Sequence, residues 1–364
     1  MKLFAWAGKA LLALLGVALV AGIAMALWPI AQTVSPLQPR ESTRYWAMEG
    51  EYRIAYTHIG TSGDRPPIIF LHGGPGGYVH SSMIEQLSRL SDLGHDIYLY
   101  DQSGTGLSDR RARPKDTTFE THVADLDEII TRHIGAERVV LMGHSFGGVI
   151  ATHYAASHPE RISALILSSP GDLKPNLYDE QGRWVNEQRY PTPSELTFVD
   201  TSATLNDDTS LARLPFRAIV SMGLAQGLNI KFAPDREVDA ALNTMASRFT
   251  RSMVCDAQNV HPEEGGAGAY SRIGVNFFPD DFYDPRADMA RMTAPVLVLH
   301  GQCDTIPYAA VAEYADLFPN GAYRMIEGAG HEQWWDQPEA YSSALRTFLV
   351  EVGAAETASF AATP

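Results

Sequence analysis

The sequence predicts an α/β protein built on a mostly parallel, doubly wound sheet. Short apolar runs recur along the chain, at residues 68–71, 97–100, 139–142, 164–167 and 295–299. Uninterrupted apolar runs of this length are typical of strands buried on both faces of a parallel sheet. Segments with helical spacing separate them, at residues 83–93, 119–134, 146–157, 308–317 and 338–350. Strands that alternate with helices in this way indicate βαβ units.

Composition narrows the class of protein and its partners. The chain has 364 residues, of which 45% are hydrophobic and 20% charged, so a disordered or fibrous protein is excluded. Lys and Arg number 28 against 43 Asp and Glu, which gives a formal net charge of -15. Such an acidic protein lacks the basic surface that nucleic acid requires. We therefore expect no nucleic-acid partner, and the sequence leaves the oligomeric state open.

The N-terminal segment is predicted to be a transmembrane anchor. Residues 10–30 contain no charged residue, and this stretch matches the roughly 20 residues that cross a bilayer. Lys2 and Lys9 precede it, so the positive-inside tendency places residues 1–9 in the cytoplasm and the large domain outside. A cleaved signal and a secreted protein are the alternative, because Ala24-Met25-Ala26 resembles a cleavage site.

Domain boundaries follow from where the strand–helix alternation begins and lapses. A polar tether is predicted at 31–50, before the first segment of the core at 51–170. The alternation lapses over 171–290, which we predict to be an insertion that covers the carboxyl edge of the sheet. The core resumes at 291–352, and residues 353–364 are expected to form a flexible tail.

The sharpest motif is Gly143-His144-Ser145-Phe146-Gly147-Gly148. It follows a predicted strand and opens a predicted helix, which is the setting of a nucleophile elbow. In such a turn the glycines remove side chains where the backbone crowds, and the new helix directs N–H groups toward the serine. Ser145 is therefore the candidate nucleophile, against the alternative of a plain glycine-rich turn.

An acid and a base are expected later in the chain, at the same sheet edge. Asp304 follows the strand that ends at His300, and His331 follows the short predicted strand Ala322 to Ile326. We predict that His331 takes the Ser145 proton as general base and that Asp304 orients its imidazole. His300 is the nearest competitor, but it precedes the acid and is expected to end a buried strand.

A second glycine-rich segment, His72-Gly73-Gly74-Pro75-Gly76-Gly77, follows the strand at 68–71. Backbone N–H groups can approach a developing oxyanion closely where glycines remove side chains. We assign the oxyanion hole to the N–H groups of Gly74 and Phe146, and expect His72 to hold the loop. A mononucleotide-binding loop is disfavoured, because the Gly-Lys-Ser/Thr ending is missing. The turn Asp101 to Ser108 is interpreted as architecture.

The two cysteines, Cys255 and Cys303, do not form a disulfide framework or show metal-ligand spacing. Cys303 is most simply a small buried residue at the end of a strand. A bridge between the two residues is an alternative outside the cytoplasm.

Taken together, these motifs resemble the proline iminopeptidase (prolyl aminopeptidase) branch of the α/β-hydrolases. The resemblance covers about residues 50–170 and 290–350, and His72-Gly73-Gly74-Pro75-Gly76 is its most specific element. It implies an eight-stranded sheet, a helical cap between strands six and seven, no metal and no organic cofactor. It also implies release of an N-terminal residue, often proline, from short peptides.

The chain departs from that branch in two respects. Ser103 and Phe146 stand where the branch often has Arg and Trp. The branch also binds the substrate's free amine with cap carboxylates, and no pattern within 171–290 identifies them here. The candidates by residue type are acids more simply interpreted as a solvated face, namely Asp235, Glu237, Asp239, Glu263 and Glu264.

The sequence thus predicts a serine hydrolase that cleaves an amide or ester bond of a small-molecule or short-peptide substrate through an acyl-serine intermediate. We favour an aminopeptidase over a carboxylic ester hydrolase. A non-catalytic, membrane-anchored binding module is the remote alternative. A carboxylate nucleophile, as in haloalkane or epoxide hydrolases, is disfavoured because Ser145 occupies that position.

Overall fold

A computed structural model describes residues 2–60, 63–197, 214–276 and 282–361 of the chain. Within them one sheet of eight strands has the order β1-β2-β4-β3-β5-β6-β7-β8. The strands are Thr43–Ala47 (β1), Arg53–Ile59 (β2), Arg65–Leu71 (β3), His95–Tyr100 (β4), Val139–His144 (β5), Ile162–Ser168 (β6), Val296–Gly301 (β7) and Gly321–Ile326 (β8). The pairings of β2 with β1 and β4 are antiparallel and the other five are parallel, so the predicted α/β fold with a mostly parallel sheet is confirmed.

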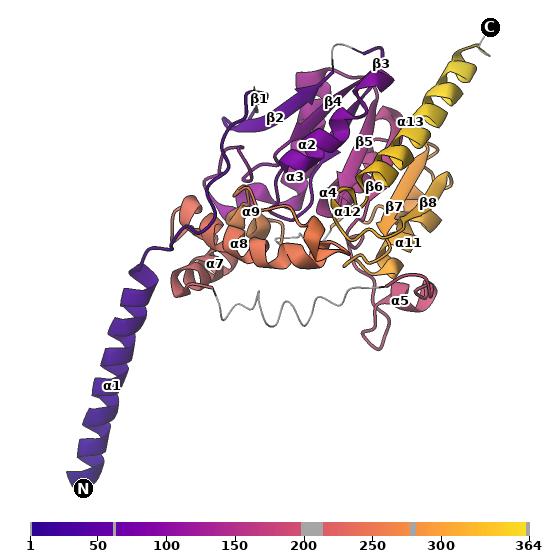
Figure 1. The fold of residues 1–364 in the computed structure, drawn as a ribbon. Coiled ribbons are helices and arrows are strands. Elements are labelled where there is room, and N and C mark those ends of the chain that lie inside the picture. The colour runs from indigo at the N-terminus through magenta and orange to yellow at the C-terminus, as the bar shows by residue number, and fades with distance from the viewer. Residues whose placement is uncertain (1, 61–62, 198–213, 277–281, 362–364) are drawn as a thin grey trace.

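Helices cover both faces of the sheet (Figure 1). Alternate residues of a strand point to opposite faces. Ile69 and Leu71 of β3 accordingly pack in the layer of α3 and α4, whereas Ile68 and Phe70 pack in the layer of α2 and α13. The helices are Ser81–Ser88 (α2), Phe119–Glu128 (α3), Phe146–Ser157 (α4), Tyr308–Leu317 (α11), Gln333–Asp336 (α12) and Pro338–Ala361 (α13).

A helical layer lies between β6 and β7 in the sequence and packs beside one end of the sheet (Figure 1). We call residues 171–290 the cap; residues 198–213 and 277–281 within it lie outside the described part of the chain. Its own small core includes Val238, Leu242 and Tyr270. The cap helices are Val185–Arg189 (α5), Phe216–Leu228 (α7), Asp235–Phe249 (α8), Ala269–Gly274 (α9) and Arg286–Met289 (α10).

The second half of the predicted tether belongs to the sheet, so that part of the prediction is wrong. β1 pairs with β2, and the Trp46 ring stacks on Tyr56 with ring centroids 3.8 Å apart. The sequence shows no apolar pattern for this edge strand, because only one of its five side chains, that of Trp46, is buried. At the other end of the chain, α13 continues through Gly353 to Ala361, where a flexible tail was expected.

The N-terminal helix α1 covers Lys2–Leu27 and extends away from the sheet (Figure 1). It begins well before residue 10, so Lys9 lies inside the helix rather than ahead of it. None of the helices in the described ranges is sufficiently long and apolar to span a bilayer, and the predicted transmembrane segment at 10–30 is therefore not supported.

Strand β3 and helix α4 approach each other very closely at Gly147. A Cβ atom on Gly147 would lie 2.2 Å from the Leu71 carbonyl oxygen and 2.6 Å from that of His72. Similarly, a Cβ on Gly143 would lie 2.4 Å from the Gly147 carbonyl oxygen. The glycine-rich turn between β5 and α4 thus exists because backbone atoms occupy the space that side chains would need.

Gly147→Ala is therefore expected to lower the free energy of unfolding by about 3 kcal/mol, the upper range for an overpacked site. Gly223→Ala is a matched control, since a Cβ on Gly223 in α7 meets nothing within 4 Å. It should leave stability unchanged or raise it by about 0.5–1 kcal/mol through better helix propensity. Urea unfolding followed by circular dichroism measures both, and equal stabilities would contradict the expectation.

Candidate active site

Ser145 occupies a strained turn between β5 and α4. Its φ of 52° and ψ of -120° lie in a region that non-glycine residues rarely adopt. The surrounding backbone imposes this geometry, because the Ser145 N–H donates to the Ser168 carbonyl at 3.0 Å and its carbonyl accepts from Gly148 and Gly171. The side chain is thereby presented at the carboxyl ends of the strands, as the sequence motif predicts.

Asp304 and His331 are brought together by the ends of β7 and β8. The His331 Nδ1 atom lies 2.8 Å from Asp304 Oδ1, so the imidazole donates from Nδ1 and leaves Nε2 able to accept a proton. Asp304 also accepts hydrogen bonds from the Ser169 hydroxyl and, at 2.9 Å, from the Ile306 N–H. These contacts fix both the carboxylate and the orientation of the ring.

Burial and charge act in opposite directions on this pair. Burial alone would raise the pKa of Asp304, but the charge and hydrogen bond of His331 outweigh it and hold that pKa well below its ordinary value. Burial would likewise lower the pKa of His331, but Asp304 raises it above its ordinary value. The pair therefore favours an ionised acid beside a histidine that readily accepts a proton.

Ser145 and His331 line one cavity of about 420 Å³, together with the loop at residues 72–77. A Cβ on Gly73 would lie 3.0 Å from the Ser145 Cβ, so this loop runs directly beside the serine. Gly74 is part of the cavity lining, and Phe146 is the first residue of α4, where a backbone N–H has no partner in a preceding turn. The cavity thus brings together the Ser145 hydroxyl, the His331 imidazole and the glycine-rich loop.

The residues interpreted as architecture have internal partners. His72 Nδ1 lies 2.8 Å from the Gly73 carbonyl oxygen, and its Nε2 accepts from the Gln102 N–H at 2.9 Å. Burial lowers the pKa of His72 to about 4, so the ring is neutral.

Asp101, in the turn that was also interpreted as architecture, accepts hydrogen bonds from the N–H groups of Val79 and Leu107, each at 2.8 Å. His300 is buried in β7, with its Nε2 3.1 Å from the Ile306 carbonyl oxygen.

Four of the five cap acids are paired with basic residues in the described structure. Asp235 pairs with Lys231 and Glu237 with Arg217. Asp239 is buried and pairs with Arg110 at 3.0 Å, and Glu264 pairs with Arg40 at 2.6 Å. The interpretation of these acids as a solvated face is therefore wrong for the buried Asp239.

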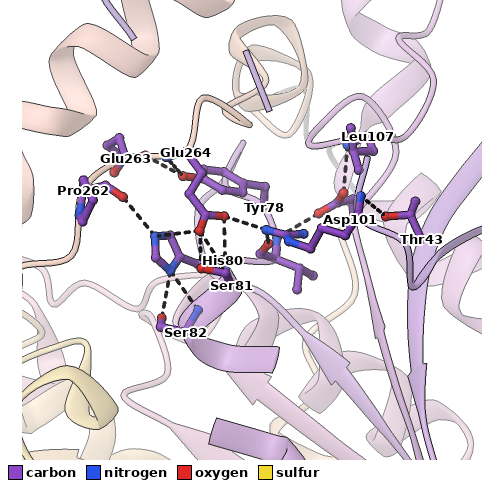
Figure 2. Close-up of polar contacts among 12 residues, drawn as sticks. Thr43, Tyr78, His80, Ser81, Ser82, Asp101, Leu107, Pro262, Glu263 and Glu264 are labelled. Carbon is purple, nitrogen blue, oxygen red and sulfur yellow. Dashed lines mark hydrogen bonds and ion pairs between the residues drawn. The ribbon is translucent and has the colours of Figure 1, made fainter. Parts of the chain in front are cut away.

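Glu263 differs from these acids because it lines the cavity that holds Ser145. The Tyr78 hydroxyl donates to Glu263 Oε2 at 2.9 Å, and Figure 2 shows the two side chains meeting. Burial raises the pKa of Glu263, while the hydrogen bond from Tyr78 counteracts part of that effect. A cap carboxylate is therefore present in the candidate site, where the sequence offered no means of selecting one.

Two further pairs near the site were not predicted from the sequence. Ser169, which supports Asp304, accepts at 2.7 Å from the Gln333 amide, and its φ of 43° is another strained position. Glu332 lies 3.5 Å from His144, next to the nucleophile, and both line the cavity. In the sequence these residues stand out only by their position, because each lies in or close to a motif or a strand end.

Cys255 and Cys303 form a disulfide with their Cα atoms 5.7 Å apart. Cys303 immediately precedes Asp304, and Cys255 belongs to the cap. The bond therefore ties the cap covalently to the loop that carries the candidate acid. The bridge that the sequence left as an alternative is present, and the interpretation of Cys303 as simply a small buried residue is wrong.

Residues 66–338 match a family model described as the alpha/beta hydrolase fold. A proline iminopeptidase from Saccharolobus solfataricus is 26% identical over 302 residues, which cover 82% of this chain and 89% of the relative. The resemblance deduced from the motifs is thereby confirmed.

Solved structures extend the likeness to the fold. An esterase from Exiguobacterium antarcticum is 19% identical, with a TM-score of 0.58 over 84% of this chain and 98% of that one. A proline iminopeptidase from Mycobacterium smegmatis is also 19% identical, with a TM-score of 0.54 over 86% of this chain and 100% of that one. At these identities both structures show a shared fold.

The His331–Asp304 pair generates a prediction about protonation. The pKa of His331 should lie above its ordinary value of about 6.5 in the native protein and fall below it in Asp304→Asn, where burial remains and the charge is gone. Because the native His331 pKa is the higher one, the contribution of charged His331 to stability is complete below about pH 6.5 and is lost as the pH rises through the native value. The contribution of ionised Asp304 has the opposite sign of pH dependence and is lost only in strong acid, because its native pKa is depressed.

Two-dimensional NMR of the imidazole nitrogens measures this titration directly. His72 is the internal control, since its pKa of about 4 keeps it neutral near pH 7 in both proteins. An unchanged His331 pKa in the variant would contradict the assigned pairing.

Proposed function

The chain belongs to the α/β hydrolase fold family, and within it we propose a serine hydrolase that cleaves acyl bonds as an aminopeptidase on short peptides. Ser145 is the proposed nucleophile, His331 the general base and Asp304 the orienting acid. The hydrogen bond between His331 Nδ1 and Asp304, and the shared cavity of His331 and Ser145, support these roles.

The proposed reaction proceeds in two acyl transfers. His331 Nε2 takes the Ser145 proton while the serine oxygen attacks the substrate carbonyl carbon, and the N–H groups of Gly74 and Phe146 hold the resulting oxyanion. Collapse of this intermediate breaks the C–N bond, and His331 returns the proton to the departing amine. A water molecule, deprotonated by His331, then attacks the acyl-serine, releases the free amino acid and restores the Ser145 hydroxyl.

The carboxylate of Glu263 is the observation that favours an aminopeptidase. Two acids line the cavity, but Glu332 already faces His144, which with His331 opposes the effect of burial and lowers the pKa of Glu332. In the described structure the neutral Tyr78 hydroxyl donates a hydrogen bond to Glu263, so a cationic amine would be a suitable counter-charge for this carboxylate. The proline iminopeptidase relatives support the same choice.

An ester hydrolase is the second candidate. Apolar side chains form much of the cavity wall and would suit a neutral acyl group, among them Leu242, Phe249, Met253, Trp334 and Trp335. The likeness of the fold to the esterase from Exiguobacterium antarcticum is compatible with this chemistry. The two candidates differ in whether activity needs the substrate's charged amine.

Parallel kinetics on proline nitroanilide and an uncharged nitrophenyl ester test the choice. Glu263→Gln should raise KM for the nitroanilide roughly 10- to 100-fold, the size of one charge-assisted hydrogen bond, and leave KM for the ester unchanged. Glu41→Gln serves as control, since Glu41 is exposed on the surface. A wild-type protein that turns over only the ester would favour the second candidate.

The same assays test the nucleophile. Ser145→Ala should remove most turnover of both substrates and all labelling by a fluorophosphonate probe, which reacts with activated serines. A folded Ser145→Ala protein with full activity would refute the assignment.

We propose further that the catalytic domain works outside the cytoplasm. The Cys255–Cys303 disulfide supports this location, because structural disulfides persist in oxidising compartments. The uncharged stretch at residues 10–30 would serve as the export signal. Protein taken from cells into an alkylating reagent should keep both thiols unmodified until a reductant is added. Alkylation of both cysteines without reductant would contradict an extracytoplasmic location.

A further inference from the structure

Residues 31–40, here called the strap, lead from the N-terminal helix across the cap to β1. Halfway along, the Leu37 N–H donates to the Gly265 carbonyl at 3.3 Å. Backbone contact is very close there, since a Cβ on Gly265 would lie 1.9 Å from the Ser35 carbonyl oxygen. Gly265 also has a φ of 82°, which favours glycine. The strap is therefore fitted against the cap loop at residues 262–265, here called the acidic loop.

Arg40 ends the strap and is held by the sheet. Its N–H donates to the Thr43 hydroxyl at 2.9 Å, and the Thr43 N–H donates back to the Arg40 carbonyl at 2.9 Å, just as β1 begins. The guanidinium then reaches the acidic loop, where it pairs with Glu264 Oε2 at 2.6 Å and contacts the Val79 carbonyl at 3.4 Å. Both side chains are about three-quarters buried, so solvent screens the pair only in part.

Residues at the start of α2 bind the other side of the Glu264 carboxylate. The Ser81 hydroxyl and N–H both donate to its carboxylate, and His80 Nε2 lies 3.7 Å from Oε1. The same His80 nitrogen lies 3.1 Å from the Pro262 carbonyl oxygen. Figure 2 shows these groups converging on Glu264, which thereby joins three segments that are far apart in the sequence.

The neighbouring Glu263 faces the active-site cavity. Tyr78 couples the two acids, because its hydroxyl donates to Glu263 at 2.9 Å and accepts from the Glu264 N–H at 2.7 Å. Glu263 also lines a second cavity of about 650 Å³, which lies between the strap and the cap. The loop thus borders two cavities, and the polar contacts of Glu263 and Glu264 hold it between them.

We propose that Arg40 is a positioning residue for substrate recognition. Through Glu264 it holds the acidic loop so that the Glu263 carboxylate faces the cavity and meets the substrate's amine. The N-terminal strap is then a working part of the substrate site rather than a passive connection. This inference rests on the proposed aminopeptidase function, in which Glu263 is the group that receives the amine.

Kinetics on the full-length chain test the proposal. Arg40→Ala should raise KM for proline nitroanilide about 3- to 10-fold, less than loss of Glu263 itself, because Tyr78 still contacts that carboxylate. Turnover at saturation and both constants for the neutral nitrophenyl ester should stay within about twofold. Arg40→Lys keeps the charge and should restore part of the loss.

Arg44→Ala is the matched control. Arg44 lies on β1, only four positions further along, and is exposed, with its guanidinium on the carbonyl oxygens of Glu41 and Thr43. It should behave as wild type. Equal KM changes in the Arg40 and Arg44 variants would overturn the proposal, because a general effect on the N-terminal segment would then account for them.

Hydrogen exchange gives a second measurement that needs no substrate. The amide of Glu264, which donates to Tyr78, should exchange faster in Arg40→Ala and unchanged in Arg44→Ala. If wild type cleaves the nitroanilide but Arg40→Ala alters neither KM nor exchange, the inference fails and the proposed function stands. If wild type cleaves only esters, the aminopeptidase function fails together with the role of Arg40 in amine recognition.

Discussion

The close approach of β3 to the start of α4 is the constraint on which the site depends. Atoms of Gly147 lie against the carbonyl oxygens of Leu71 and His72, and this contact brings two distant motifs together. One motif supplies Ser145 on its strained turn, and the other supplies the glycine loop beside it. Because both follow strands of one sheet, the Ser145 hydroxyl and the glycine loop are held side by side by the fold itself.

The pKa values of the carboxylates in the site depend on their individual hydrogen-bond and ion-pair partners rather than on the large negative charge of the chain. Asp304 is buried and Glu332 is partly buried, and each faces a histidine that opposes the effect of burial on its pKa. Glu263 is the exception, since burial raises its pKa and its hydrogen-bond partner is a neutral hydroxyl. The protein alone therefore offsets only part of the cost of burying the charged form of Glu263. Buried carboxylates of this kind are typical of ligand-binding sites.

The parts of the fold and of the site that could be predicted from the sequence are those marked by a short local motif. The strands, the glycine turns and the candidates Ser145, Asp304 and His331 are marked by short motifs at strand ends, and the structure brings Asp304 and His331 into contact. The cap acids carry no such mark. Glu263 and Asp239 differ in their partners, Tyr78 and Arg110, which lie more than a hundred positions away in the sequence. Edge strand β1 was missed for a related reason, since its single buried side chain gives no periodic pattern.

The disulfide between Cys255 and Cys303 constrains how the cap can move. Cys255 follows the end of α8, and Cys303 sits beside Asp304 on a loop that leaves β7. A displacement of the cap away from the sheet would have to pivot about this covalent bond, because the bond cannot stretch. The acid would stay close to the axis of any such rotation, so a substrate could be admitted with little disturbance of the proton-transfer pair.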